Sequence, residues 1–371
     1  MQNIIECTAT GLVYHNPKPY LRSVHAWHPT VVRMEDGSLV CAFDLGQAVE
    51  SLDYGSYLAR SSNGGLTWSP PEPLFIETAK RLSTHAVRIS RMRDDTLVGW
   101  GARFLRDEHP DEGLTNRANL GYVPTELISL KSSDGGRSWE GPRQIQPPLV
   151  GPSFEICHPV LELPDGRWLA PMGTWKNWKG EAPNGMKAIA LVSHDHGETW
   201  PEYVDVMDGY HNQVIHFEQS ITRLVDGRLL AVAWALHEPS GKSRPTPYAF
   251  SSDARAFSRP RLTGLRGQTA KITCLPDGRV LCLYRRDDQP GLWANLSRID
   301  GDDWVNLSEA VLWQGAASGM AGDASRAEEL SRLKFGFPNM VVLPEGDIFA
   351  VFWCCEDSLH NIRWLRIRVS G

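Results

Sequence analysis

The sequence contains no long hydrophobic run and no excess of basic charge. Its 371 residues include 38 Lys and Arg against 44 Asp and Glu, which gives a formal net charge of −6. An acidic balance of this kind provides no electrostatic attraction for nucleic acid or for an anionic membrane surface. No apolar stretch approaches the roughly 20 residues that a membrane-spanning helix requires. We therefore expect neither nucleic acid nor a membrane among the partners of this chain.

A regular cysteine pattern is also absent. The seven cysteines are irregularly spaced, and Cys354 and Cys355 are adjacent, which is poor geometry for a disulfide. No Cys or His pair has the spacing of zinc ligands, so we expect no metal site and no cofactor. The first residues lack the basic segment and apolar core of a signal peptide. Together with reduced thiols, this favours a cytoplasmic location, unless a signal has been removed from a secreted protein.

Turn-forming residues are abundant, with 33 Gly and 25 Pro, and one motif built from them recurs. It reads Ser-x-Asp-x-Gly-x-Ser-Trp in residues 132–139, with good copies at 61–68 and 193–200, a worn copy at 251–257 and a further candidate at 297–304. Asp or Asn before Gly favours a tight turn, and its side chain accepts hydrogen bonds from the turn backbone. The Trp anchors the turn to a sheet. Each copy therefore predicts a turn between two strands.

A second repeat consists of an apolar strand, a short acidic turn and another apolar strand. Its six turns are Asp36-Gly37, Asp94-Asp95, Asp165-Gly166, Asp226-Gly227, Asp277-Gly278 and Glu345-Gly346. Six such hairpins indicate radial repetition, because a single unit cannot bury both of its faces. We predict an all-β fold, a six-bladed β-propeller of four-stranded antiparallel blades. The acidic turn joins strands one and two of each blade, and the Ser-x-Asp motif joins strands three and four.

The prediction treats residues 1–371 as one domain, because no linker or low-complexity tract divides the chain. Residues 360–369 alternate in polarity as a strand does, and we expect them to share a blade with an N-terminal strand around 11–14 and so close the ring. The only helix that the sequence predicts covers residues 325–333.

The recurring Ser-x-Asp-x-Gly-x-Ser-Trp motif resembles the Asp-box of the sialidase superfamily, and three good copies make the resemblance specific. In the predicted arrangement of strands, the resemblance covers nearly the whole chain. The resemblance implies a carbohydrate-active propeller whose site lies at one mouth of the central channel, where the inner strands begin. It also implies that particular positions hold the groups that bind and cleave a sialic acid.

Carried over by position, the resemblance gives an incomplete sialidase site. Trp27 stands where the family has the Arg of its R-I-P motif, and Trp234 stands where a second Arg is expected. Phe337 stands where the nucleophilic Tyr is expected, and Phe cannot form a covalent glycosyl intermediate. The family's acid/base Asp corresponds to Asp53, its mid-chain Glu to Glu218, and a remaining carboxylate-binding Arg to Arg285. The sequence therefore resembles a divergent member with a remodelled pocket.

Other polar residues fall at the starts of the first three inner strands. Converging His, Glu and Arg side chains would suit acid/base chemistry on a polar ligand, and the candidates are His28, His85, His158, Glu155 and Arg88. A His next to Pro at a strand start is also a common hydrogen-bonded structural residue. A buried carboxylate at Glu218 favours a role in a site, because an unpaired one is costly.

The sequence thus favours a glycoside hydrolase acting on an acidic sugar or glycan. As its catalytic residues we predict Asp53, Glu218, His28, His85 and His158. As its substrate-binding residues we predict Trp27, Arg88, Glu155, Trp234, Arg285 and Phe337. Two alternatives remain: a non-catalytic carbohydrate-binding propeller, and a His-dependent polysaccharide lyase acting on uronic acids. The sequence does not predict an oligomeric state.

Overall fold

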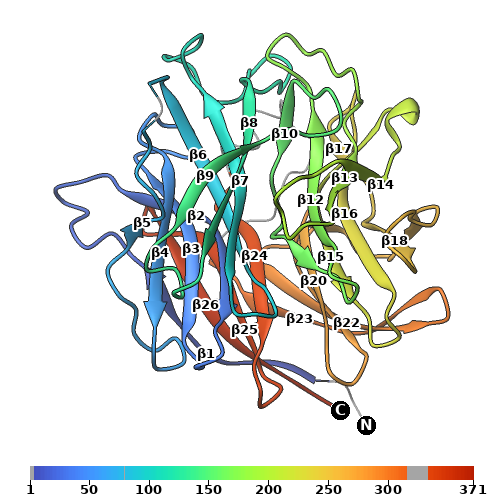
Figure 1. The fold of residues 1–371 in the computed structure, drawn as a ribbon. Helices are drawn as coiled ribbons and strands as arrows, with labels where there is room; N and C mark the ends of the chain where they lie inside the picture. Colours follow the sequence, from blue (N-terminus) through green and yellow to red (C-terminus); the bar gives the residue numbers. More distant parts are fainter. Residues whose placement is uncertain (1–3, 79, 316–332) are drawn as a thin grey trace.

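The computed structural model describes residues 4–78, 80–315 and 333–371. It consists of six antiparallel sheets, so the predicted six-bladed, all-β propeller is confirmed (Figure 1). Within the described ranges the only helical element is the short 3-10 turn η1, Tyr210–Asn212. The helix predicted at 325–333 lies outside the described residues, except for Leu333.

The first three blades follow one another along the chain. Blade 1 contains β2 (His25–Arg33), β3 (Leu39–Gly46), β4 (Gly55–Ser61) and β5 (Glu72–Pro73). Blade 2 contains β6 (Ser83–Arg91), β7 (Leu97–Leu105), β8 (Thr125–Ser132) and β9 (Glu140–Ile145). Blade 3 contains β10 (Ser153–Glu155), β11 (Leu161–Glu162), β12 (Trp168–Trp175), β13 (Ala188–Ser193) and β14 (Glu202–Met207), with β10 and β11 both paired to β12.

The last three blades continue the pattern. Blade 4 contains β15 (Val214–Arg223), β16 (Leu229–His237), β17 (Lys242–Ser243), β18 (Pro247–Ser251) and β19 (Arg261–Leu262). Blade 5 contains β20 (Gly267–Cys274), β21 (Val280–Arg286), β22 (Leu292–Asp300) and β23 (Asp303–Trp313). Blade 6 contains β24 (Phe335–Val342), β25 (Ile348–Glu356), β26 (Leu359–Ser370) and β1 (Ile4–Tyr14).

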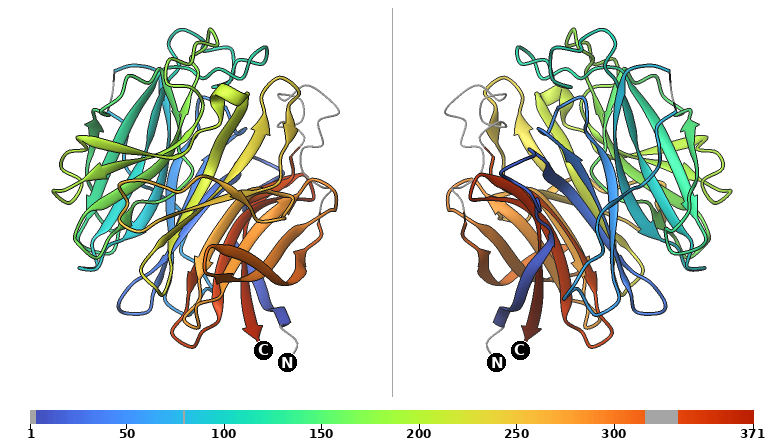
Figure 2. Two further views of the ribbon diagram at one scale, coloured as in Figure 1. Left: turned by 90° about the vertical axis from the view of Figure 1, so that its right-hand side faces the viewer. Right: turned by 90° about the vertical axis from the view of Figure 1, so that its left-hand side faces the viewer.

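The outermost strand of blade 6 comes from the other end of the chain. Strand β1 pairs with β26 in antiparallel register from Ile4 opposite Ser370 to Tyr14 opposite Ile362. Both views of Figure 2 place the two termini close together at the same end of the molecule. This pairing joins the first and last segments of the sequence within one sheet.

The acidic turns join the first and second strands of every blade, as the sequence predicts. At Asp165-Gly166 the carboxylate accepts a hydrogen bond of 3.1 Å from the backbone N–H of Arg167. Gly166 has φ +88° and donates its N–H to the carbonyl of Leu163 at 3.0 Å. Glycine suits this position because other residues rarely adopt a positive φ.

The Asp-box motif joins the third and fourth strands and is held by its own side chains. In the copy at 132–139, the hydroxyl of Ser132 accepts the N–H of Gly136 at 2.8 Å. The carboxylate of Asp134 accepts the N–H of Ser138 at 2.9 Å, and the indole of Trp139 donates to the Gly136 carbonyl at 3.2 Å. The motif is therefore a structural turn rather than part of a site.

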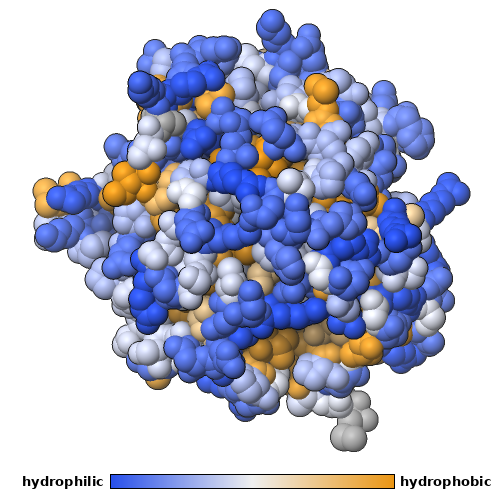
Figure 3. Space-filling model, in the orientation of Figure 1, coloured by the Kyte–Doolittle hydropathy of each residue, from blue (hydrophilic) through white to orange (hydrophobic). Residues whose placement is uncertain are grey.

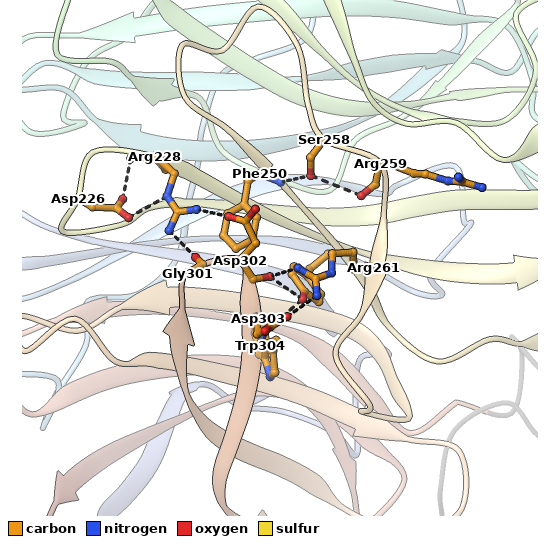
Figure 4. Close-up of polar contacts among 11 residues, drawn as sticks. Asp226, Arg228, Phe250, Ser258, Arg259, Arg261, Gly301, Asp302, Asp303 and Trp304 are labelled. Atoms are coloured by element: carbon orange, nitrogen blue, oxygen red, sulfur yellow. Dashed lines mark hydrogen bonds and ion pairs between the residues drawn. The ribbon is translucent and has the colours of Figure 1, made fainter.

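Contacts beside the degenerate copy of the motif join blade 4 to blade 5 (Figure 4). Arg228 of blade 4 donates to Asp302 at 2.7 Å and to the carbonyl of Gly301 at 2.9 Å, both in blade 5. Arg261, which follows the worn motif, donates to the carbonyl of Asp302 at 2.6 Å and pairs with Asp303. These exposed contacts tie two neighbouring blades together, although exposed ion pairs stabilise a fold only weakly.

The described ranges contain no helix with the length and apolarity needed to cross a bilayer. Hydrophilic side chains cover most of the face shown in Figure 3, with hydrophobic ones scattered between them. The large apolar side chains are packed between the blades, where successive sheets stack face to face.

Candidate functional site

Four inner strands contain a bulge at the same position. In each, the pairing register with the second strand skips two residues, and the first of the two has a left-handed backbone. These residues stand eight positions before the turn acid of their blade, and they are His28 (φ +49°), Glu218 (φ +45°), Thr269 (φ +52°) and Phe337 (φ +50°). Non-glycine residues seldom adopt this conformation, and it occurs often at functional sites. A bulge also redirects a side chain, and all four side chains line one cavity.

This cavity has a volume of about 440 Å³ and is lined by residues from all six blades. Its size suits a small molecule such as a short saccharide. Of the eleven residues that the sequence predicts for the site, the structure places eight around it: Trp27, His28, Arg88, Glu155, Glu218, Trp234, Arg285 and Phe337. Residues far apart in the sequence are thus brought together by the circular arrangement of the blades.

Two carboxylates meet on one side of the cavity. Glu155 ends strand β10, is 8% exposed, and accepts the backbone N–H of Glu218 at 3.1 Å. Burial, followed by the nearby charge of Glu218, raises the pKa of Glu155 to about 7. A buried oxygen of Glu218, Oε2, accepts no hydrogen bond from the described part of the chain. The pair therefore combines a carboxyl that can hold a proton near neutrality with a neighbouring acceptor.

The ammonium group of Lys271 lies near this pair and binds the backbone around it. It is buried and donates to the backbone carbonyls of Cys157, Glu218 and Gln219 at 3.0, 3.1 and 3.0 Å. It also lies 4.9 Å from the ring centroid of Phe337, a favourable cation–π distance. Lys271 was not predicted from the sequence. It fixes the backbone of the bulge that carries Glu218 and places a positive charge near both carboxylates.

Arg285 brings a buried positive charge to the same cavity. It is 2% exposed, and it donates from Nε to the side chain of Gln268 at 3.2 Å and from Nη1 to the carbonyl of Phe335 at 2.8 Å. Burial lowers the pKa of Arg285 to about 10, so the guanidinium stays charged at neutral pH. No carboxylate of the described residues forms an ion pair with it. The charge of Glu218 offsets part of this burial cost, but no carboxylate of the described residues binds the guanidinium directly, which favours an anionic ligand.

A second titratable network surrounds Asp44, which is fully buried in strand β3. Its carboxylate accepts hydrogen bonds from Tyr54 at 2.9 Å, Ser56 at 2.6 Å and Arg88 at 2.9 Å. Burial alone would raise the pKa of Asp44, but Arg88, His28 and Ser56 together lower it below its usual value. Arg88 is therefore already paired, unlike Arg285.

His28 is connected to this network through Tyr54. Its Nδ1 lies 2.7 Å from the hydroxyl of Tyr54, whose single proton is donated to Asp44. The hydroxyl oxygen must then accept a proton from Nδ1 of His28, so that in the neutral form of the ring the lone pair is on Nε2. Burial, and then the charge of Asp44, raises the pKa of Tyr54 well above its ordinary value. His28 is thus oriented as a possible base.

Asp53 is not among the residues that line the cavity. Its Oδ1 accepts the backbone N–H of Gln47 at 3.1 Å and the hydroxyl of Ser51 at 2.6 Å. These contacts close the exposed loop between β3 and β4. From this position the carboxylate supports the loop, while the neighbouring Tyr54 reaches the cavity.

His85 and His158 also lie outside the cavity lining. His85 packs on Phe75, with ring centroids 4.3 Å apart, and burial lowers its pKa. His158 accepts the backbone N–H of Ile221 at 3.3 Å and contacts the carbonyl of Pro159 at 2.7 Å. Burial, aided by Lys271, lowers the pKa of His158 to about 3. His158 is therefore a neutral residue whose two ring nitrogens both bind backbone.

The rim of the cavity is organised by the buried Arg106. It donates to the carbonyl of Glu50 at 3.1 Å and to that of Glu112 at 2.6 Å, which joins the loops that follow β3 and β7. The carboxylate of Glu50 accepts the hydroxyl of Thr115 at 2.6 Å, and both residues line the cavity. Within the described ranges, no group of three His, Cys, Asp or Glu side chains is arranged to hold a metal ion.

Comparison with known proteins agrees with this architecture. The model of the BNR repeat-like domain family matches residues 115–350. No match was found among curated protein sequences. Among solved structures, a protein of unknown function from Dyadobacter fermentans DSM 18053 aligns over 99% of both chains, with a TM-score of 0.74 and 21% identity.

Two enzymes of known structure share the fold at lower identity. The K499G mutant of the NanB sialidase from Streptococcus pneumoniae aligns over 96% of this chain and 70% of its own, with a TM-score of 0.63 and 11% identity. The α-L-arabinanase from Penicillium chrysogenum, solved with arabinobiose, aligns over 98% of both chains, with a TM-score of 0.67 and 13% identity. At these identities the likeness shows a shared fold.

Proposed function

Since the chain belongs to the BNR repeat-like domain family, with a sialidase-like propeller fold, we propose that it is a glycoside hydrolase acting on an acidic sugar. The observation that carries this proposal is the pair of carboxylates in the cavity, Glu155 and Glu218, beside the buried guanidinium of Arg285. Glycosidases generally use two carboxyl groups with different protonation states, and the raised pKa of Glu155 provides that difference.

In the proposed complex, Arg285 binds the carboxylate of the sugar. A guanidinium forms strong, charge-assisted hydrogen bonds with a carboxylate, and burial increases their strength. The hydroxyl of Thr269, a buried group without a hydrogen-bond partner in the described ranges, lines the cavity on the same blade as Arg285. It is suited to bind a sugar hydroxyl. The ring of Trp234 lies 5.5 Å from the Arg285 guanidinium and holds it in place.

In the proposed reaction, Glu155 donates its proton to the glycosidic oxygen as the bond to the anomeric carbon breaks. Glu218 accepts a proton from the water that attacks the same carbon, so that the free sugar and the leaving alcohol are produced. By sequence position, Phe337 corresponds to the nucleophilic Tyr that the resemblance implies, and it offers no hydroxyl to the cavity that it lines. The proposal therefore relies on the two carboxylates and not on a tyrosyl intermediate.

A substrate screen with matched variants tests this proposal. We expect the wild-type protein to hydrolyse at least one chromogenic glycoside or oligosaccharide of an acidic sugar. Glu155→Gln and Glu218→Gln should each lower kcat/KM by about 10²–10⁴-fold, which is the usual contribution of a general acid or base. The control is Glu140→Gln, an exposed carboxylate on β9, and it should match the wild type.

Two outcomes would contradict the proposed hydrolysis. If both glutamine variants turn over every substrate as fast as the wild type, the carboxylate pair is not the catalytic centre. If acidic glycans bind in the cavity and no glycoside is cleaved, the protein is a carbohydrate-binding propeller without hydrolase activity.

The contact between His28 and Tyr54 favours a second candidate, a lyase acting on uronic acids. Here the Nε2 of His28 would remove the proton at C5, next to a carboxylate held by Arg285, and the bond from C4 to the leaving oxygen would break. A double bond forms between C4 and C5, and the leaving oxygen takes up a proton.

Mass spectrometry separates the two reactions, because hydrolysis adds one water to the products and elimination adds none. The lyase would be supported if the wild type forms elimination products and the His28→Ala variant loses this activity.

A further inference from the structure

The cavity has a second, aromatic side that the carboxylate chemistry does not use. Four rings from blades 1 and 6 line it together: His25 and Trp27 on β2, Trp353 on β25 and His360 on β26. The ring centroid of His360 lies 5.1 Å from that of Trp27, 5.6 Å from that of Trp353 and 5.1 Å from that of His25. We call these four residues the aromatic cluster. Trp353 and His360 were not identified from the sequence.

The hydrogen bonds of the two histidines fix their tautomers. The Nε2 of His25 lies 3.0 Å from the hydroxyl of Ser23, and its Nδ1 accepts the backbone N–H of His360 at 3.1 Å. Because Nδ1 of His25 presents a lone pair, the contact with Nδ1 of His360 at 3.4 Å is favourable only when Nδ1 of His360 carries the proton. The lone pair on Nε2 of His360 is then the acceptor that remains for another molecule.

The aromatic cluster is uncharged at neutral pH. Burial lowers the pKa of His25, and burial, followed by the charges of His25 and Lys334, lowers the pKa of His360 to about 4. The nearby carboxylate of Glu356 is paired with Arg363 at 2.8 Å. The rings of this cluster therefore carry no charge of their own, in contrast to Arg285 on the other side of the cavity.

The aromatic cluster nevertheless offers hydrogen-bond donors. No described residue accepts a hydrogen bond from the indole N–H of Trp27 or of Trp353, although both rings are more than nine-tenths buried. Neither N–H is among the buried polar atoms that lack a partner, so both are accessible, and a ligand hydroxyl can accept from them. Flat rings with a few polar atoms at their edges are the surfaces on which pyranose rings stack.

We propose that the aromatic cluster is a subsite for a neutral sugar residue, joined through the scissile bond to the acidic sugar that Arg285 binds. The proposal rests on the function proposed above, and it names the substrate class more closely as a glycan in which an acidic residue is linked to a neutral one. The neutral ring stacks on Trp27 and His360, and its hydroxyls bind the two indole N–H groups and Nε2 of His360.

Binding measurements on inactive protein test this subsite. In the Glu218→Gln background, calorimetry would compare glucuronic acid and N-acetylneuraminic acid with 3′-sialyllactose and with a glucuronic acid–N-acetylglucosamine disaccharide. We expect at least one of the saccharides with a neutral residue to bind about tenfold more tightly than its free acid. His360→Ala and Trp27→Phe should remove most of this advantage and leave the affinity for the free acid unchanged. Tyr203→Ala, an exposed aromatic on β14, is the control.

A second arm separates this proposal from the function on which it rests. Methyl glycosides of glucose, galactose, mannose and N-acetylglucosamine would be tested by saturation-transfer NMR against wild type and His360→Ala. If a neutral glycoside binds through His360 while no acidic probe binds, the acidic-sugar proposal fails and the neutral subsite stands. If the acids bind through Arg285, but no neutral glycoside binds and neutral residues add no affinity, the subsite is overturned and the acidic-sugar proposal stands. Thermal unfolding of each variant shows whether it is folded.

Discussion

At the scale of single residues, the cavity is distinguished by charges held away from water. Glu155 and Arg285 are 8% and 2% exposed, and they belong to different blades. An isolated buried charge is unfavourable, so each must be neutralised, paired or stabilised by a ligand. Protonation serves this purpose for Glu155, whose pKa is raised, whereas Arg285 stays charged and is partly stabilised by the nearby charge of Glu218. The two residues therefore predict different dependences on pH and on ligand.

The first prediction at this scale concerns stability. The pKa of Glu155 is about 7 in the folded protein against a usual 4.5, so the folded state binds the proton more tightly than the unfolded state. Its contribution to the free energy of unfolding is fully present below about pH 4.5 and is lost as the pH rises through about 7, a change of about 3 kcal/mol. Urea unfolding at pH 5 and pH 8 should show this loss in the wild type.

The Glu155→Gln variant isolates that contribution. Its free energy of unfolding should fall less between pH 5 and pH 8 than that of the wild type, because the glutamine does not titrate. The exposed Glu140→Gln variant should keep the wild-type dependence. An equal change in the free energy of unfolding between pH 5 and pH 8 in the wild type and in Glu155→Gln would show that the folded protein does not hold the Glu155 carboxyl in its protonated form.

At the scale of elements, a recurring bulge places four of the residues that line the cavity. The bulge in β2, β15, β20 and β24 turns one side chain of each inner strand into the cavity, eight residues before the turn acid. The Asp-boxes at the other strand connections have a purely structural role. Four of the six blades therefore combine a structural outer turn with a strained inner position, and strained positions occur often at functional sites.

The Asp-boxes give a prediction at this scale. Asp195 accepts hydrogen bonds from the backbone and hydroxyl of Thr199 at 2.8 and 2.6 Å and from the hydroxyl of Ser193 at 2.8 Å. Asp253 in the worn copy accepts one from the N–H of Arg255 at 2.9 Å. Asp195→Ala should lower the free energy of unfolding by about 1–3 kcal/mol, and Asp253→Ala by clearly less. Equal losses in urea unfolding would mean that the motif's hydrogen bonds do not stabilise the blade.

The same elements show what the sequence could predict and what it could not. The turn residues are periodic, so six blades could be counted directly. Which residue of each inner strand faces the cavity is not evident from the sequence. In blade 3 the position eight residues before Asp165 is Cys157, and the neighbouring His158 has its ring bound to the backbone. In blade 1 the acid that contacts Arg88 and His28 is Asp44, which is buried inside an apolar strand, whereas Asp53, which matches the family's position, binds its own loop. The side chains that reach the cavity are determined by bulges and by contacts with neighbouring blades, and a local sequence pattern does not predict either.

At the scale of the whole molecule, the ring of blades creates a cavity with two unlike sides. Glu155, Glu218 and Arg285 come from blades 3, 4 and 5, whereas the aromatic cluster comes from blades 1 and 6. Residues as distant in sequence as Trp27 and His360 are 5.1 Å apart, measured between ring centroids, because β2 packs beside β25 and β26. This division matches the two halves of the proposed glycan, one acidic and one neutral.

The most direct test of this account is a crystal structure of Glu218→Gln with an acidic oligosaccharide identified in the substrate screen. The account predicts that the sugar occupies the cavity between the six blades, with its carboxylate on the guanidinium of Arg285 and its glycosidic oxygen within hydrogen-bond distance of Glu155. A saccharide bound elsewhere on the propeller, or one bound in the cavity with its carboxylate turned away from Arg285, would contradict it.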